Sequence, residues 1–310
     1  VSYAFPVWFV LGGIVMGLGI GTASLASRAI GSGNKEVVRE IATHAMILSI
    51  VVGIIVITVG LSSIDVVFGL LGSIEETKPY VMEYMEIYYW GGIFMAVPMI
   101  GNSVMRASGD ATTPSILMAS SAIVNALLDP ILIFGWFGFP AMGVRGAALA
   151  SVLSNVLFLI AALCILIFRD NLIQFANHSL KSIVESWKKI LHVGLPAIAS
   201  NLIVPLSTAL VTALISSYGQ TAVAAYGLAG RLEAFIIVIL MALGGAIAPY
   251  VGQNFGAKRF DRLEEGFKFS MRFILVYSVF CIVFLYFSAE FFLGFFTADP
   301  EVIKIAKMQL

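Results

Sequence analysis

Long apolar stretches constrain this chain more than any other feature of its sequence. Eight of them occur, at about 4–27, 41–63, 84–105, 115–136, 146–168, 190–217, 222–250 and 270–292. Each is long enough for a helix to cross the hydrocarbon core of a membrane, which takes roughly 20 mostly apolar residues. The runs are continuous, whereas the strands of a membrane β-barrel alternate between apolar and polar residues. The pattern therefore predicts an all-α membrane protein with eight transmembrane helices.

The composition excludes several other classes of protein. Only 12% of the residues are charged and 60% are hydrophobic, against about 25% charged and 45–50% apolar in a soluble domain. So few charges cannot cover a water-exposed surface, and the net charge of zero gives no bulk attraction to nucleic acid. Cys164 and Cys281 lie inside apolar runs, and the sequence has no catalytic triad, nucleotide-binding loop or metal-ligand cluster. We expect neither an enzyme nor a bound cofactor or metal.

The basic residues indicate how the helices are oriented. Thirteen of the 18 Lys and Arg residues lie in one alternate set of loops: Arg28, Lys35, Arg39, Arg106, Arg169, Lys181, Lys188, Lys189, Lys258, Arg259, Arg262, Lys268 and Arg272. The other loops hold only Lys78, Arg145, Lys304 and Lys307, and Arg231 lies within a span. Because loops rich in Lys and Arg stay in the cytoplasm, we expect a multi-pass protein of the cell (inner or plasma) membrane, with its first residues outside.

The chain contains an internal repeat, in which one part of the sequence matches a later part without a gap. The matched pairs include Gly19 with Gly244, Gly31 with Gly256, Glu40 with Glu265 and Gly69 with Gly294. The first spans of the two copies are six spans apart, so both copies have the same orientation, which is one of the repeat designs of secondary transporters. We therefore expect part of a twelve-helix, two-lobe (6+6) pseudo-two-fold transporter, without its first and last three helices. The expected parts are an N-terminal lobe (1–168, helices 2–6), a cytoplasmic linker (169–189) and a partial C-terminal lobe (190–310, helices 7–9).

Asp129 is the clearest candidate functional residue. A charge in mid-membrane costs about 2.5–3.5 kcal/mol on insertion scales and is functional by default. Asn125 precedes Asp129 by one helical turn on the same face, and Ser151 and Asn155 fall at a similar depth on the following span. Asp129, Asn125 and Ser151 can together bind a proton or a small cation such as Na⁺, and Asn155 is a candidate for lining a substrate cavity. The alternative is that Asp129 only joins two helices by a hydrogen bond.

Three further polar residues are candidates for lining a substrate cavity. Arg231 and Glu233 lie within one span, where a structural ion pair or a position near the water interface is an equally good interpretation. Asn201 belongs to a polar side of the 190–217 span, which either lines an aqueous cavity or bonds to another helix. The glycines of the first span, Gly13, Gly17 and Gly21, are spaced four residues apart and predict close packing against another helix.

The chain resembles the multidrug and toxic compound extrusion (MATE) family, most specifically over residues 106–151. The features that carry the resemblance are Arg106…Gly109-Asp110…Pro114, Asn125-x-x-x-Asp129-Pro130, Gly143-Val144…Gly146-Ala147-Ala148, Gly194-Leu195-Pro196, Arg231-x-Glu233 and Gly252-Gln253-Asn254-x-Gly256-Ala257. The resemblance implies two six-helix lobes around a central cavity and export of cytoplasmic substrate in exchange for H⁺ or Na⁺. It also implies a coupling site at Asp129 with Asn125, Ser151 and Tyr84, whose second acid is on the absent first span.

These observations predict an ion-coupled exporter of drugs, organic cations or toxic metabolites that works by alternating access. Its expected partners are a cationic amphiphilic small molecule and the lipid bilayer, without nucleic acid, and we expect a monomer. In the Arg106–Pro114 turn, Gly109 is expected to end one helix and Asp110 or Thr112 to cap the next. Two alternatives are a lipid-linked oligosaccharide flippase of the same superfamily, which needs a cationic cavity, and a non-transporting membrane receptor or scaffold.

Overall fold

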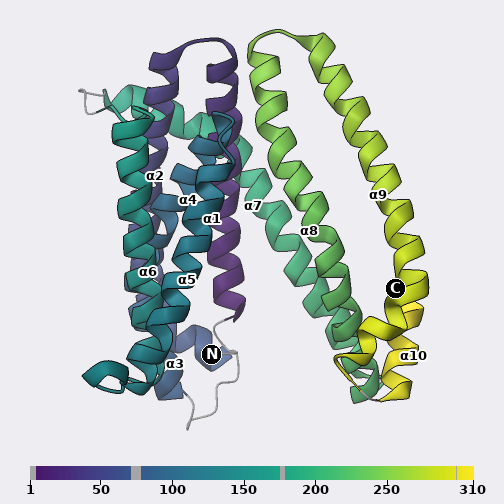
Figure 1. Ribbon diagram of the computed structural model, residues 1–310. Helices are drawn as coiled ribbons and strands as arrows, with labels where there is room; N and C mark the ends of the chain where they lie inside the picture. Colours follow the sequence, from purple (N-terminus) through teal and green to yellow (C-terminus); the bar gives the residue numbers. More distant parts are fainter. Residues whose placement is uncertain (1–4, 71–77, 175–178, 298) are drawn as a thin grey trace. The chain divides into compact units, whose positions relative to one another are not determined.

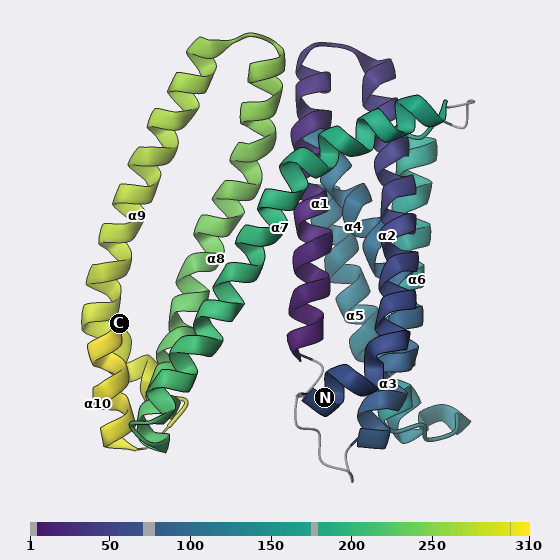
Figure 2. The same cartoon turned by 180° about the vertical axis from the view of Figure 1, so that it is seen from behind.

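The structure, a computed structural model, describes residues 5–70, 78–174, 179–297 and 299–310, and these residues form helices joined by short connections (Figure 1, Figure 2). The helices are α1 (Phe5–Gly31), α2 (Lys35–Leu70), α3 (Lys78–Trp90), α4 (Gly92–Ala107), α5 (Thr112–Phe134), α6 (Val144–Cys164), α7 (Leu180–Ser216), α8 (Gln220–Gly256), α9 (Phe260–Gly294) and α10 (Pro300–Gln309). A 3₁₀ turn (Trp136–Gly138) follows α5, and a π-helical turn (Ile165–Arg169) extends α6.

Seven helices within the described ranges are long and apolar enough to cross a membrane. They correspond to seven of the eight predicted spans, so the all-helical class is confirmed and the count of eight is not. The remaining run, 84–105, is divided between α3 and α4, because the helix is interrupted at Gly91. A β-carbon at Gly91 would lie 2.5 Å from the Val152 side chain of α6. The interruption therefore coincides with a close helix contact that only glycine permits.

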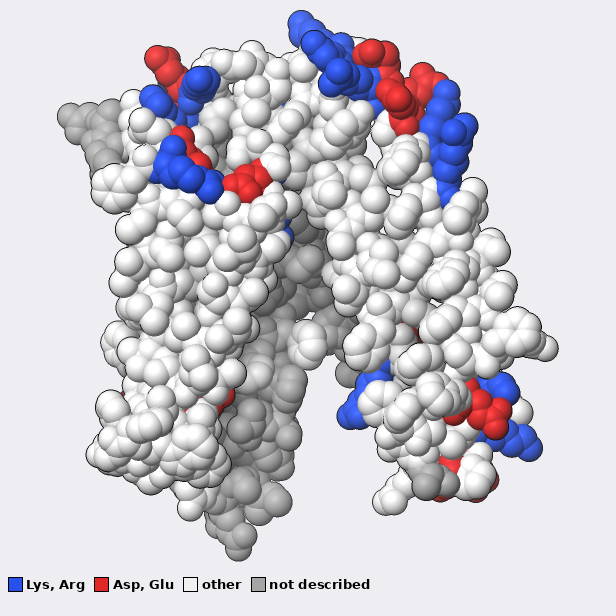
Figure 3. Space-filling view, viewed as in Figure 1, with Lys and Arg blue, Asp and Glu red and all other residues white. Residues whose placement is uncertain are grey.

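Charged side chains gather at the ends of the helices, and the view in Figure 3 shows long uncharged surfaces between them. This distribution agrees with helices that cross a membrane. The start of α7 belongs to the segment expected as a polar linker (169–189), so that about half of the linker is helical.

The chain divides into two compact units, Val1–Leu202 and Ile203–Leu310, and the division falls within α7. Unit 1 is centred on buried residues of α1, α2, α4, the end of α6 and α7, including Leu18, Met46, Ile100, Leu166 and Ile190. Unit 2 has a smaller core of α8, α9 and α10 residues: Ala225, Ala229, Leu232, Leu293, Val302 and Ala306. The lobe boundaries expected from the repeat remain a prediction.

The helix ends follow the internal repeat. Helix α1 ends at Gly31 and α8 ends at Gly256, and these two glycines are a matched pair of the repeat. Helix α2 begins at Lys35 and α9 begins at Phe260, which the same alignment of the two copies places opposite each other. The two sequence copies therefore form the same helix–turn–helix element. The glycine ridge of α1 packs closely on α7, as predicted: Gly17 lies against Ile198, and Gly21 lies against the backbone of Ile190 and Gly194.

Candidate functional site

A cavity of about 370 Å³ lies within unit 1 between α1, α3, α4, α5 and α6. Its polar lining comes mainly from facing positions of α5 and α6: Ser121, Asn125, Ser151, Ser154 and Asn155. Aromatic and methionine side chains form the remainder of the wall, chiefly Trp8, Tyr84, Tyr88, Met95, Met99, Met118 and Phe158. Neither Lys, Arg, Asp nor Glu is among the described residues that line it. The cavity is therefore neutral and amphipathic.

Close packing of α5 on α6 positions the polar wall. Gly146 near the start of α6 is buried against the backbone of Leu132 and Ile133 at the end of α5, where a side chain would not fit. The Met142 N–H donates to the Leu132 carbonyl at 3.0 Å, and the Gly143 N–H donates to the Ile133 carbonyl at 3.1 Å. These contacts hold the end of α5 and the start of α6 together and bring their polar faces into register.

Asn125 and Ser151 meet across this helix pair. The Asn125 Nδ2 lies 3.5 Å from the Ser151 Oγ, and the Ser151 hydroxyl donates to the Ala147 carbonyl at 3.1 Å. The Tyr84 hydroxyl interacts with Ser151 and is within electrostatic range of Asp129. The structure thus brings together Asn125, Ser151 and Tyr84, and Asn155 lines the same cavity one turn farther along α6.

Asp129 lies one helical turn beyond Asn125 on α5 and is half-buried. Among the described residues, its carboxylate makes no hydrogen bond or ion pair, and the role of Asp129 stays a prediction. Pro130 follows directly and cannot donate a backbone hydrogen bond, which leaves the carbonyl one turn earlier without its helical partner. Asp129 is therefore an ionisable group next to the polar wall and a weakened stretch of α5.

Apart from Tyr84, the residues of the aromatic wall were not identified from the sequence. The rings of Tyr84 and Tyr88 stack with centroids 6.1 Å apart and planes 13° apart. Trp8 of α1 lies 6.0 Å from the Tyr84 ring and 5.6 Å from the Tyr88 ring. The Tyr88 hydroxyl donates to the Met95 sulfur at 3.4 Å. The four-residue spacing of Tyr84 and Tyr88 is a signal for a shared helix face, but the position of Trp8 depends on how α1 packs on α3.

The other candidate residues do not line this cavity. Asn201 of α7 lies against Gly13 of α1, and its side-chain nitrogen is buried without a hydrogen-bond acceptor among the described residues. Arg231 and Glu233 belong to α8 in unit 2, where Arg231 is exposed and Glu233 is half-buried. Within the described part of the chain, no ion pair joins those two side chains.

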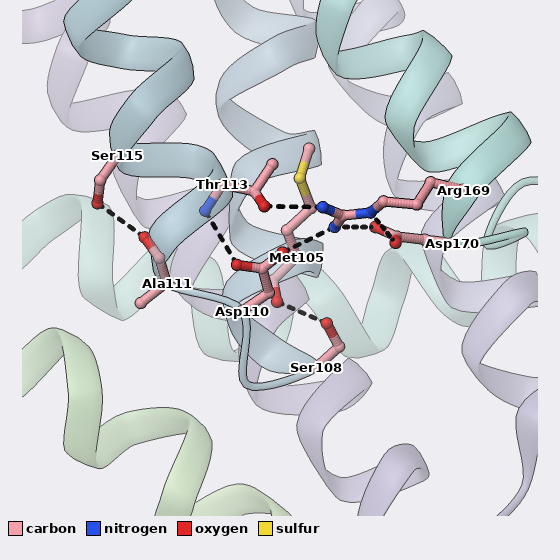
Figure 4. A network of polar contacts seen from close by, with 8 residues as sticks. All are labelled: Met105, Ser108, Asp110, Ala111, Thr113, Ser115, Arg169 and Asp170. Atoms are coloured by element: carbon pink, nitrogen blue, oxygen red, sulfur yellow. Dashed lines mark hydrogen bonds and ion pairs between the residues drawn. The ribbon is translucent and has the colours of Figure 1, made fainter.

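A polar network ties the α4–α5 turn to the end of α6 (Figure 4). The Arg169 guanidinium donates to Asp110 Oδ2 at 2.7 Å, to Thr113 Oγ1 at 2.8 Å and to Asp170 Oδ1 at 2.6 Å. Gly109 has a φ of +94° and ends α4, and Asp110 Oδ1 accepts the Thr113 N–H at 2.9 Å. Asp110, of the two residues proposed, is therefore the cap of α5. Hydrogen bonds from Thr113, together with the charge of Arg169, hold the pKa of the Asp110 carboxyl at about 2.

Comparison with known proteins adds independent information. The MatE family model matches residues 1–131 and 196–310. The chain is 32% identical over 304 residues to the FAD transporter of Shewanella oneidensis, covering 98% of this chain and 67% of that protein. It is 27% identical to the probable multidrug resistance protein YoeA of Bacillus subtilis, covering 99% of this chain and 67% of that one. The chain thus spans about two thirds of the length of these relatives.

Solved structures give the same result for the fold. The crystal structure of the Vibrio cholerae MATE transporter VcmN in the bent form superposes with a TM-score of 0.92 at 27% identity, covering 99% of this chain and 69% of that one. A MOP superfamily transporter from Pyrococcus furiosus superposes with a TM-score of 0.83 at 26% identity, covering 100% of this chain and 68% of that one.

Proposed function

The chain belongs to the MatE family of membrane transporters, and on that premise we propose that it forms part of a secondary antiporter that exports drugs, organic cations or toxic metabolites in exchange for H⁺ or Na⁺. It is a multi-pass protein of the plasma membrane, and its relatives are transporters and not enzymes. The coupling ion and the substrate class are the parts of this statement that need experimental tests.

The observation that carries the proposal is the position of Asp129 beside a neutral cavity. The carboxylate lies one turn from Asn125, which faces Ser151 at 3.5 Å. Oxygen atoms are the preferred ligands of hard cations, and Asp129, Asn125 and Ser151 supply a carboxylate, an amide and a hydroxyl oxygen on two adjacent helices. Either a proton or Na⁺ would neutralise the carboxylate and thereby remove the cost of a charge in the membrane. Ion binding and release at this point therefore alter the energetics of α5 next to the cavity.

The rest of the cavity wall supports an aromatic or amphipathic substrate. Trp8, Tyr84 and Tyr88 present ring surfaces, and Met95, Met99 and Met118 are polarizable and adaptable. An organic cation gains about 0.5–2 kcal/mol from the face of an aromatic ring. The same wall offers little to a polyanion, since neither Lys nor Arg is among its described residues. This argues against the oligosaccharide flippase, which needs a cationic cavity.

A flavin dinucleotide is a second candidate substrate. The relative with 32% identity is named a FAD transporter, and a flavin ring is a planar aromatic group that the Trp8, Tyr84 and Tyr88 rings can contact. The diphosphate of such a molecule would require basic partners outside this cavity. Competition between FAD and a planar organic cation such as ethidium in one transport assay separates the two candidates.

The test uses the full-length protein in liposomes with either a proton or a sodium gradient imposed. We expect Asp129→Asn to abolish gradient-driven ethidium export while leaving the protein folded. Asp261→Asn, the same chemical change at an exposed position at the start of α9, is the matched control and should export normally. Normal gradient-driven export by Asp129→Asn would refute the role of this carboxylate, and export with only one of the gradients identifies the coupling ion.

A further inference from the structure

The connection between α5 and α6 differs in composition from the described turns after the other long helices. Residues 135–143, which we call the α5–α6 loop, read GWFGFPAMG, so that the loop has no charged residue and the Trp136 indole is its one polar side-chain group. The turns after α1, α7 and α8 carry polar side chains, such as Asn34, Ser217 and Arg259. Because a turn in water is normally polar, this composition indicates that the α5–α6 loop lies in an apolar environment.

The aromatic side chains of the α5–α6 loop are exposed. Trp136 and Phe139 are each 54% exposed, and Phe137 is 86% exposed. Figure 1 and Figure 2 show the loop at the lower ends of α5 and α6, where it projects sideways from the two helices. A contiguous exposed apolar surface of this kind marks a site that contacts a membrane or another protein. The loop is therefore a surface that an apolar partner covers.

The backbone of the loop is folded, so the rings are held in a defined arrangement. Gly135 has a φ of +74°, and a β-carbon there would lie 2.6 Å from the Phe139 carbonyl oxygen and 2.8 Å from the Ala141 nitrogen. The Phe139 N–H donates to the Trp136 carbonyl at 3.3 Å. Phe137 has a φ of +59°, a left-handed conformation that glycine adopts more readily. A strained phenylalanine at the most exposed position of the loop indicates that its ring is used for contact.

The length of α5 places the loop at the boundary of the hydrocarbon core. Helix α5 has 23 residues from Thr112 to Phe134, which gives about 35 Å at 1.5 Å per residue, and the hydrocarbon core is about 30 Å thick. Directly after the loop, Arg145 pairs with Glu83 at 3.2 Å, and both side chains are partly exposed. This ion pair marks the level at which charges stay hydrated. The α5–α6 loop therefore lies at the level of the lipid headgroups.

We propose that the α5–α6 loop inserts sideways into the lipid bilayer. The Phe137 and Phe139 rings lie among the first acyl carbons, and the Trp136 ring lies at the headgroup level, where its N–H can donate to a lipid oxygen or to water. Tryptophan is enriched at this level of membranes because its ring is apolar and its N–H is polar. Since the loop has no charged residue, its partner is the apolar part of a phospholipid and not an anionic headgroup.

Insertion in lipid would fix the last turn of α5. The loop is attached to that turn by two hydrogen bonds, from the Met142 N–H to the Leu132 carbonyl and from the Gly143 N–H to the Ile133 carbonyl. The turn comes directly after Pro130, where α5 lacks one backbone hydrogen bond. The lipid thus holds α5 on one side of Pro130 while the helix moves on the other. This consequence rests on the proposed function, whereas the lipid contact itself does not.

Spin labelling of the full-length protein in phosphatidylcholine liposomes tests the contact. Cys164 and Cys281 are replaced by alanine, together with any other cysteine of the full-length protein, and Phe137→Cys or Phe139→Cys carries a nitroxide. Both labels should collide more often with oxygen, which concentrates in lipid, than with a water-soluble nickel chelate. Leu127→Cys, at a 62% exposed position of α5, should behave in the same way. Lys258→Cys, in the polar turn after α8, should show the reverse preference.

Tryptophan fluorescence gives a second measurement that introduces no label. Brominated phosphatidylcholine quenches tryptophan rings that touch its acyl chains. Trp136→Phe should therefore reduce the amount of fluorescence lost when brominated lipid replaces ordinary lipid. Trp187→Phe is the matched control and should leave that amount unchanged, because the Trp187 indole donates to the His44 carbonyl within unit 1 at 2.9 Å.

Three results would overturn the proposal. Labels at positions 137 and 139 that collide with the nickel chelate as often as the label at position 258 would place the loop in water. Labels that collide rarely with either reagent would place it against other parts of the protein. A cross-link through Phe137→Cys between two differently tagged molecules would assign the loop to a second copy of the chain. All three are measured without transport, so they leave the proposed exporter function to its own test.

Discussion

Gly33 and Lys258 occupy matching positions in the two copies of the internal repeat, and both have a positive φ, +76° and +56° respectively. The Gly33 N–H donates to the Ile30 carbonyl at 2.9 Å, and the Lys258 N–H donates to the Phe255 carbonyl at 3.1 Å. In each turn the next N–H reaches back five residues, from Asn34 to Ala29 at 3.3 Å and from Arg259 to Asn254 at 2.9 Å. This pair of bonds is the Schellman motif, so the two copies share a backbone turn although their residues differ.

The turn predicts opposite effects for two reciprocal substitutions. A left-handed conformation costs an L-residue roughly 1–2 kcal/mol, whereas glycine adopts it readily but loses more entropy on folding. We expect Lys258→Gly to stabilise the protein by up to about 1 kcal/mol and Gly33→Lys to destabilise it by a similar amount. No described atom lies within 4 Å of a β-carbon built at Gly33. The stability change of Gly33→Lys therefore reports backbone strain and not a steric clash. Melting temperatures in detergent check both variants, and a lower value for Lys258→Gly would contradict this explanation.

The Asp110 carboxylate, which accepts hydrogen bonds from Thr113 and pairs with Arg169, predicts a pH dependence of stability. Because the pKa of Asp110 is lowered to about 2 in the folded protein, its contribution is present above the unfolded-state pKa of about 3.9 and is lost as the pH falls toward 2. Both side chains are partly exposed, so the ion pair is worth about 0.5–1 kcal/mol. Asp110→Asn keeps a good helix cap and should lower the free energy of unfolding by that amount at pH 7.

The free energy of unfolding of wild type and of Asp110→Asn, measured as a function of pH, separates the effect of the carboxylate charge from the effect of the helix cap. The difference should shrink between about pH 4 and pH 2, where the wild-type carboxyl becomes protonated. Asp110→Ala also removes the acceptor for the Thr113 N–H and should cost about 1 kcal/mol more at every pH. A difference in the free energy of unfolding that stays constant across this pH range would show that the charge of the Asp110 carboxylate, with its partners Thr113 and Arg169, contributes nothing.

Gly21 predicts how closely α1 and α7 must approach. A β-carbon there would collide with the Ile190 carbonyl of α7, and backbone cannot move aside as a flexible side chain can. Gly21→Ala should therefore destabilise the protein by about 1–3 kcal/mol. Gly12→Ala, on the same helix with open space around it, is the control and should be neutral or slightly stabilising. Equal melting temperatures for the two variants would show that the α1–α7 contact is not close.

Local features of the site could be predicted from the sequence, and distant contacts could not. Helical spacing placed Asn125 and Asp129 on one face, and alternating spans placed Ser151 at a similar depth, where it meets Asn125. The sequence left Asp110 and Thr112 as the two candidates for the cap of α5, and the hydrogen bond from the Thr113 N–H identifies Asp110. Arg169, in contrast, joins Asp110 across 59 residues, and His44 meets Ser186 across 142. Such pairs depend on how whole helices pack, which hydrophobic spacing within one helix does not specify.

Ser151 predicts a graded effect on ion coupling. Its hydroxyl is the contact between Asn125 and α6, and the loss of one such hydrogen bond costs about 0.5–1.5 kcal/mol. In liposomes with the full-length protein, Ser151→Ala should raise the ion concentration for half-maximal export by roughly 2- to 10-fold, and Ser151→Thr should retain export. Ser115→Ala removes a hydroxyl that likewise bonds one turn back, to Ala111, but outside the cavity, so it should have no effect. Equal effects of Ser151→Ala and Ser115→Ala would remove Ser151 from the coupling site.

The stacked rings of Tyr84 and Tyr88 predict where a planar substrate binds. Tyr88 contacts Trp8 and Tyr84 in the wall of the unit 1 cavity, and an aromatic contact of this kind is worth about 0.5–1.5 kcal/mol. Tyr88→Ala should therefore weaken ethidium binding to the purified full-length protein by roughly 2- to 10-fold, measured by fluorescence polarisation. Tyr88→Phe keeps the ring and should bind nearly as well, while Tyr218→Ala, at an 83% exposed position, should bind normally. If Tyr88→Ala binds ethidium as tightly as wild type, the rings of this cavity do not form the substrate site.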